Sequence, residues 1–110
     1  MESYTLEICG LTRELPIVQI DEDLSVASFV ILGDTELVSQ VAPELAARLP
    51  EFDVLISAEA KGIPLIYEIS REFNMNHLVA RKSIKAYMEN PVSVEVNSIT
   101  TEEEQILCLN

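Results

Sequence analysis

Basic side chains gather in one part of an otherwise acidic sequence. The 110 residues carry a formal net charge of −12, yet five of the seven Lys and Arg residues are Lys61, Arg71, Arg81, Lys82 and Lys85. Lys61 lies in the segment Glu59-Ala60-Lys61-Gly62, which follows an apolar run and precedes apolar residues at helical spacing. At such a strand-to-helix turn, free backbone N–H groups and the positive end of the helix dipole favour an anion. The chemistry indicated is the binding of a phosphate or pyrophosphate.

A parallel βαβ unit is the element that would position these residues. The apolar run at residues 53–58 predicts a strand buried on both faces of a parallel sheet. Gly62-Ile63-Pro64 then opens a helix, and the apolar run at 77–81 predicts a second strand. Strand, crossover helix and strand within about 30 residues form a βαβ unit with a right-handed crossover. Parallel strands end at the same edge of the sheet, and ligands bind beyond that edge. Since the second strand ends at Arg81 and Lys82, these residues should lie near the Glu59–Gly62 turn.

Other strands are expected on both sides of this unit. The β-branched residues and polar breaks of the N-terminal part indicate strands at residues 4–9, 15–21 and 25–32. Beyond the loop at 82–91, the alternation of Val92, Val94 and Val96 with polar residues, followed by the apolar C-terminal residues, indicates a β-hairpin or a pair of extended arms. We therefore expect one α/β domain over residues 1–110, with a parallel βαβ core.

A helix is expected between the N-terminal strands and the βαβ unit. Asp34 is placed to cap its start, and apolar residues recur at helical spacing between residues 37 and 49. Pro43 should kink this helix or begin its second part, and Pro50 should end it.

The composition excludes several classes of function. A net charge of −12 argues against nucleic acid and anionic membranes as partners, because both draw affinity from clustered cations. No signal peptide and no apolar run of the ~18–20 residues that span a bilayer is present, so a cytoplasmic protein is expected. Cys9 and Cys108 have no metal-ligand or disulfide spacing, and we expect both as reduced core residues and no protein-held metal.

Two interpretations of the Glu59–Gly62 turn remain open on the residues alone. A strand-to-helix turn with Gly and Lys is common as a purely structural feature, and neither GxxxxGK[ST] nor GxGxxG occurs. Glu59 would either hydrogen-bond locally or approach a ribose and a metal ion. The pairing of basic sites at the ends of two neighbouring strands is what favours a function.

The segment DVLISAEAKGIPLIYEISREFNMNHLVARKSIK, residues 53–85, resembles the purine-type members of the type I phosphoribosyltransferase family, particularly the adenine phosphoribosyltransferases. The resemblance covers roughly residues 10–109 and implies a partial, Rossmann-like phosphoribosyltransferase fold. It implies that Glu59, Ala60, Lys61 and Gly62 contact the pyrophosphate of 5-phosphoribosyl-1-pyrophosphate (PRPP), with a non-proline cis peptide at Ala60–Lys61. By the same resemblance Arg81, Lys82 and Lys85 meet the pyrophosphate, in some relatives across a dimer interface, and Mg²⁺ shares the charge of the departing pyrophosphate.

The implied activity is that of a glycosyltransferase of purine salvage, within nucleotide metabolism. It would transfer the phosphoribosyl group of PRPP to a purine base, with adenine favoured, and release pyrophosphate and a nucleoside monophosphate. Residues 86–105 match the mobile hairpin that closes over the reacting centre. The family's defining motif, two acidic residues after an apolar strand and then a Thr-Gly loop, does not occur here. The resemblance therefore implies an N-terminal fragment that is inactive alone, with its catalytic residues unassigned.

Two other functions stay open. The chain resembles the related domain of a purine-operon repressor, which implies a regulatory domain that senses PRPP. A non-catalytic dimerisation module is the third interpretation, because a truncated sheet edge exposes N–H and C=O groups that a second copy can pair with. A homodimer is expected on this ground.

Overall fold

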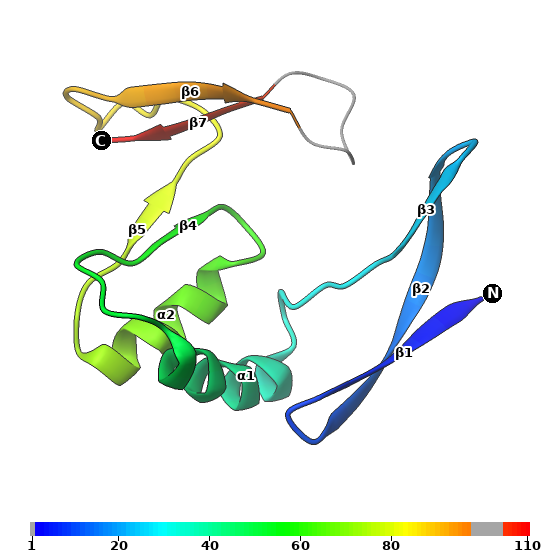
Figure 1. The fold of residues 1–110 in the computed structure, drawn as a ribbon. Coiled ribbons are helices and arrows are strands. Elements are labelled where there is room, and N and C mark those ends of the chain that lie inside the picture. Colours follow the sequence, from blue (N-terminus) through cyan, green and yellow to red (C-terminus); the bar gives the residue numbers. More distant parts are fainter. Residues whose placement is uncertain (1, 98–104) are drawn as a thin grey trace.

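The structure is a computed structural model that describes residues 2–97 and 105–110. Within these residues it is a mixed α/β fold of two helices and three small sheets, which confirms the expected fold class (Figure 1). The elements are β1 (Ser3–Ile8), β2 (Leu11–Asp21), β3 (Leu24–Ala27), α1 (Thr35–Arg48), β4 (Ile56–Ala58), α2 (Ile63–Phe73), β5 (Leu78–Ala80), β6 (Val92–Val96) and β7 (Gln105–Leu109).

The N-terminal sheet is antiparallel, in the order β1-β2-β3. Cys9 and Gly10 join β1 to β2, and both have positive φ, at 50° and 77°, as a two-residue hairpin turn of type I′ requires. The expected strand at 25–32 is too long, because β3 ends at Ala27. The chain leaves the sheet there so that Ile31 can be buried against α1.

Helix α1 begins as the sequence predicts. The Asp34 carboxylate accepts the N–H of Leu37 at 3.1 Å and so caps the first turn. The helix runs through Pro43 as one element and ends at Arg48, two residues before Pro50. Its apolar face carries Leu37, which packs with partly buried residues of the β1–β2 turn.

Strands β4 and β5 are parallel, and α2 connects them, so the expected parallel βαβ unit is confirmed. The expectation of a strand over 53–58 buried on both faces is wrong. β4 is only three residues long, and the side chains of Ile56 and Leu78 are 50% and 46% exposed. The physical reason is that helices cover one face only. Ser57 faces the start of α2, so its neighbour Ile56 points to the open face together with Leu78, its partner in the register.

The C-terminal strands form an antiparallel hairpin and not separate arms, with Val92 opposite Leu109. Reciprocal backbone hydrogen bonds of 2.9 and 2.8 Å between Arg81 and Cys108 attach this hairpin to the end of β5. Of the hairpin expected at residues 86–105, residues 98–104 lie outside the described part of the chain.

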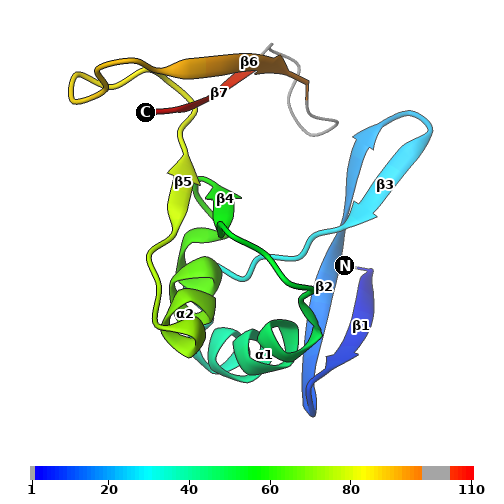
Figure 2. The same cartoon turned by 60° about the vertical axis from the view of Figure 1, so that its left-hand side comes forward.

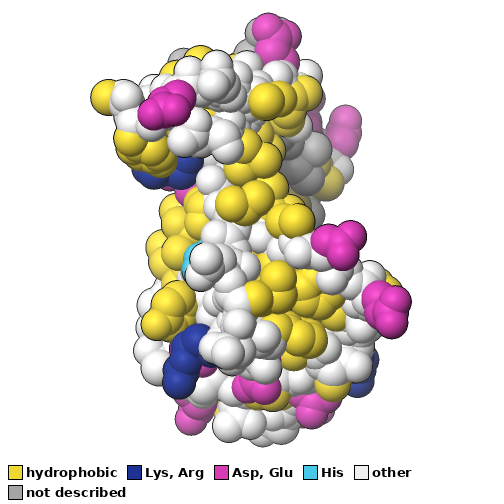
Figure 3. Space-filling view, turned by 90° about the vertical axis from the view of Figure 1, so that its left-hand side faces the viewer, with side chains coloured by type: hydrophobic (Ala, Val, Ile, Leu, Met, Phe, Trp, Pro, Cys, Tyr) yellow, Lys and Arg dark blue, Asp and Glu magenta, His cyan; other side chains and the backbone are white. Residues whose placement is uncertain are grey.

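The molecule is open and extended. The hairpin lies beyond β5, and the β1–β3 sheet extends along another side of the helices as a separate long arm (Figure 2). The radius of gyration is 16.3 Å, whereas a compact domain of this length would have about 13 Å. Hydrophobic side chains accordingly cover much of the middle of one face (Figure 3). No helix among the described residues is both long and apolar enough to cross a membrane.

Candidate anion-binding site

The turn from Glu59 to Gly62 joins the end of β4 to the start of α2. Gly62 is the N-cap of α2, no side chain caps this end, and Pro64 lies in the first turn. Gly62 has φ −84° and ψ −8°, a backbone conformation that any residue can adopt. Glycine is therefore needed here for its small size and not for its conformational freedom. A Cβ at this position would collide with Ser57 Oγ on β4. The close approach that glycine permits is therefore between the helix start and its own preceding strand.

One peptide bond of this turn is cis, but not the expected one. The cis bond joins Glu59 to Ala60, one residue before the Ala60–Lys61 bond that the sequence resemblance implied. The expectation was wrong by one position.

The carboxylate of Glu59 ties the turn to the end of β5. Its Oε1 accepts the backbone N–H of Lys82 at 2.6 Å and lies 3.3 Å from Nε of Arg81. The backbone N–H of Glu59 also donates to the carbonyl of Ala80, at 3.0 Å. The Lys82 N–H bond and the Arg81 guanidinium hold the pKa of Glu59 below its ordinary value, and the charge of Lys85 acts in the same direction. The ends of the two parallel strands therefore meet at Glu59.

Arg81 connects three segments at this place. Its guanidinium lies between the Glu59 carboxylate and the hydroxyl of Tyr87, to which Nη1 donates at 3.0 Å. Hydrogen bonds with Glu59 and Tyr87 raise the pKa of Arg81 above its ordinary value. Its backbone pairs with Cys108 of β7, and Cys108 Sγ lies 3.1 Å from the carbonyl of Ser83. The loop after β5 and the C-terminal hairpin are thus fixed around one cation.

The three lysines of the candidate site have different surroundings. Lys82 contributes its backbone N–H to Glu59, and its side chain is exposed. Lys85 is half-buried and close enough for its charge to act on Glu59. Lys61 is exposed, and within residues 2–97 and 105–110 none of the three ammonium groups forms an ion pair. The structure brings Glu59, Arg81, Lys82 and Lys85 together, and places Lys61 in the same turn without a direct contact to them.

The role of Tyr87 and Cys108 at this site was missed by reasoning from the sequence. Tyr87 lies in a loop without apolar periodicity, so no pattern marks it as a partner of Arg81. Cys108 was expected in the core and is buried, whereas Cys9 is only half-buried at its hairpin turn; both are free thiols.

The described residues contain no cluster of three or more His, Cys, Asp or Glu that would hold a metal ion by itself. A separate groove of about 570 Å³ lies between the starts of α1 and α2, with Val38, Ile63 and Tyr67 in its lining, but it does not include residues 59–62. His77 lies outside the candidate site, and its Nδ1 is 3.1 Å from the hydroxyl of Ser70. The donors of the candidate site are thus cations and N–H groups, which suit an anion.

No protein-family model matches the sequence, and no curated protein matches it at a significant level.

Proposed function

We propose that this chain provides the pyrophosphate-binding part of a purine phosphoribosyltransferase, with adenine as the favoured base. The observation that carries the proposal is the contact of Glu59 with both Lys82 and Arg81. It brings the β4–α2 turn, which carries Lys61, within hydrogen-bonding distance of the end of β5, which Arg81 and Lys82 follow. A pyrophosphate bound at this place would meet cations from both strand ends. The sequence resemblance over residues 53–85 supplies the identity of the ligand.

In this proposal the pyrophosphate of PRPP lies against the lysines of the site. The ammonium groups of Lys61, Lys82 and Lys85 would be its partners, together with the Arg81 guanidinium, which is held between Glu59 and Tyr87. Since the described residues offer no metal cluster of their own, Mg²⁺ would arrive with PRPP, bound to its phosphate oxygens. The metal would share the negative charge of the departing pyrophosphate.

The proposed reaction breaks the bond from ribose C1 to the pyrophosphate and forms a bond from C1 to a purine nitrogen. The cations at the ends of β4 and β5 would stabilise the charge that develops on the leaving group. The segment that the resemblance matches to a mobile hairpin, of which the structure describes residues 86–97 and 105, would close over the centre and exclude water, which prevents hydrolysis. The products are AMP and pyrophosphate, and such a purine salvage enzyme would act in the cytoplasm.

The proposed fold is the N-terminal part of a Rossmann-like phosphoribosyltransferase domain. The parallel βαβ unit with a cationic site at its strand ends supports it. The Thr-Gly loop that binds the 5-phosphate in this family does not occur in the 110 residues, so we expect PRPP binding without turnover.

The test is a calorimetric titration of the chain with PRPP and Mg²⁺. We expect saturable binding that Lys82→Ala and Lys61→Ala each weaken, whereas Arg48→Ala, which removes an exposed cation from the far end of α1, leaves it unchanged. Adenine added with PRPP should give no AMP. Absence of binding, or equal affinity in all four proteins, contradicts the assignment, and AMP formation contradicts the expectation of an inactive chain.

A dimerisation role is the second candidate, and one observation favours it. In the described part of the chain β4 pairs only with β5, so the other edge of β4, which carries the half-exposed Ile56, is open. An open edge with apolar side chains favours pairing with another strand. We propose a second copy of the chain as the partner, paired edge to edge about a two-fold axis.

A further inference from the structure

The Glu59 carboxylate occupies a place built for an anion. Its Oε1 accepts a backbone N–H at the end of β5 and lies beside the Arg81 guanidinium, while the charge of Lys85 reaches it. Backbone N–H groups and guanidinium groups are also the donors that bind phosphate oxygens. The chain therefore satisfies its own anion site with a side chain that comes from the turn of that site.

We propose that Glu59 is a built-in competitor, which holds the position of a phosphate oxygen and is displaced when a pyrophosphate binds. The inference rests on the proposed function for the identity of the ligand. The sequence resemblance does not assign this role to Glu59. In this role the Glu59 carboxylate lowers the affinity of the site for any anion that has to displace it.

The Glu59 carboxylate can be displaced without loss of the site's structure, because other contacts hold the surrounding residues in place. The turn stays fixed by the backbone bonds from Glu59 to Ala80 and from Ile63 to Ala60. Arg81 stays fixed by Tyr87 and by its backbone pairing with Cys108. The Glu59 side chain is 20% exposed, so it has a path to solvent. Displacement therefore exchanges one anion for another at a site that keeps its shape.

Competition of this kind makes the site selective for polyanions. A ligand that offers one negative charge gains about what the loss of the Glu59 contacts costs, so chloride or acetate has little advantage. A pyrophosphate replaces the Glu59 oxygen with one of its own and still has oxygens left for the three lysines, which form no ion pair with any residue that the structure describes. The expected order of affinity is pyrophosphate first, inorganic phosphate second, and monovalent anions last.

The experiment compares inorganic pyrophosphate binding in the unmodified chain, Glu59→Gln and Glu68→Gln by calorimetry at pH 7. Glu68→Gln is the matched control, because Glu68 also lies 3.3 Å from an arginine, Arg71, but on the surface of α2. A like charge within ~4–6 Å shifts an ionic equilibrium by about tenfold or more, so Glu59→Gln should bind pyrophosphate about tenfold more tightly. Glu68→Gln should bind as the unmodified chain does.

Each other outcome has a definite meaning. Equal affinities in the unmodified chain and Glu59→Gln overturn the competitor role and leave the proposed function standing. Weaker binding by Glu59→Gln also overturns it, because Glu59 would then organise the site. If neither protein binds pyrophosphate, the proposed function and the inference both fail.

A second measurement avoids any folding defect of the variant. The side-chain carboxyl carbon of Glu59 and the amide of Lys82 are followed by NMR while pyrophosphate is added to the unmodified chain. Displacement predicts that both signals move together and saturate at the same concentration. Saturation of Lys82 with an unmoved Glu59 carboxyl signal would overturn the inference.

Discussion

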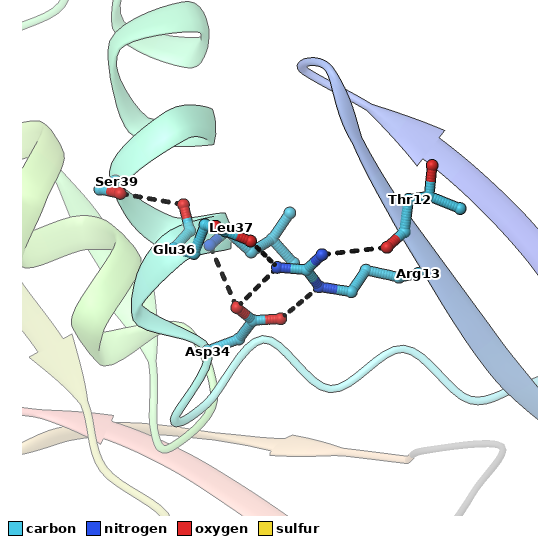
Figure 4. A network of polar contacts seen from close by, with 6 residues as sticks. All are labelled: Thr12, Arg13, Asp34, Glu36, Leu37 and Ser39. Atoms are coloured by element: carbon cyan, nitrogen blue, oxygen red, sulfur yellow. Dashed lines mark hydrogen bonds and ion pairs between the residues drawn. The ribbon is translucent and has the colours of Figure 1, made fainter.

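Arg13 on β2 and Asp34 at the start of α1 form a two-point ion pair, with Nε 2.8 Å from Oδ2 and Nη2 3.1 Å from Oδ1 (Figure 4). The same Nη2 reaches Glu36 Oε1 at 2.9 Å, and the same Asp34 caps α1 through the N–H of Leu37. One carboxylate therefore both starts the helix and holds the N-terminal arm against it.

Substitutions at Asp34 should separate these two roles. Asp34→Ala removes the cap and the ion pair, and Asp34→Asn keeps a capping oxygen while removing the charge. We expect Asp34→Ala to lower the melting temperature most, Asp34→Asn less, and Glu36→Ala least, because Glu36 is the more exposed partner of Arg13. Circular dichroism melts give this order, and equal melting temperatures for all three variants would count against it.

Stability should fall in acid. Arg13 holds the pKa of Asp34 below its ordinary 3.8, and the Lys82 N–H holds that of Glu59 below 4.5. A carboxyl group with a lowered pKa in the folded state stabilises the protein above its unfolded pKa and loses this effect as the pH falls through its folded pKa. We expect a plateau above about pH 5.5 and a decline below about pH 4.5, shallower in Asp34→Asn. Urea unfolding at several pH values measures this, and a free energy of unfolding that rises in acid would contradict it.

Tyr87 should support pyrophosphate binding without touching the ligand. Tyr87→Phe removes the hydroxyl that accepts from Arg81, so the guanidinium is less well oriented. One hydrogen bond of this kind predicts a loss of affinity of roughly two- to tenfold. Tyr67→Phe, which also deletes one exposed hydroxyl but lies on α2, is the control and should bind normally. An unchanged affinity in Tyr87→Phe would show that Arg81 needs no support.

Gly62 and Ser57 should be coupled. In Gly62→Ala the new methyl group meets Ser57 Oγ, which can rotate away at the loss of its 3.2 Å hydrogen bond to the Ala58 carbonyl. We expect Gly62→Ala alone to lower the free energy of unfolding by about 1 kcal/mol. In a Ser57→Ala background the same change should cost less, since the oxygen is gone. Purely additive effects in this double-mutant cycle would mean that the two residues do not meet.

The open edge of β4 should mediate self-association. Ile56→Lys places a charge on this edge, which natural sheets use to prevent pairing, and should shift the mass measured by light scattering from two chains to one. Tyr4→Lys changes a residue of similar exposure, 55% against 50%, on the distant strand β1 and should leave the mass unchanged. A single-chain mass for the unmodified protein would rule out the dimer.

Local signals in the sequence predicted most of the elements. The Asp34 cap, the end of α1 before Pro50 and the alternation from Val92 each depend on residues close together in the chain, and each was confirmed. The sequence predicted a strand only over residues 15–21, whereas β2 begins at Leu11. The polar residues after Leu11 are typical of a loop, and only their pairing with β1 makes them part of a strand. The exposure of Ile56 was missed for a related reason. An apolar run does not indicate whether one or two layers will cover it.

The candidate site was predicted in outline and not in detail. Spacing along the βαβ unit was enough to bring Lys82 near the Glu59 turn. Their hydrogen bond joins residues 23 apart, and its geometry depends on the register of β4 against β5. The same holds for Arg13 and Asp34, which are 21 residues apart. Such pairs follow from packing, which single-residue preferences do not determine.

The burial of Cys108 means that its rate of alkylation depends on opening of the structure around it. Cys108 is 1% exposed at the junction of β5 and the hairpin, whereas Cys9 is half-buried at the turn between β1 and β2. An alkylating reagent should therefore modify Cys9 early and Cys108 only in molecules whose hairpin has separated from Arg81. The slow labelling rate of Cys108 would then report how often the hairpin separates from Arg81, without any engineered probe.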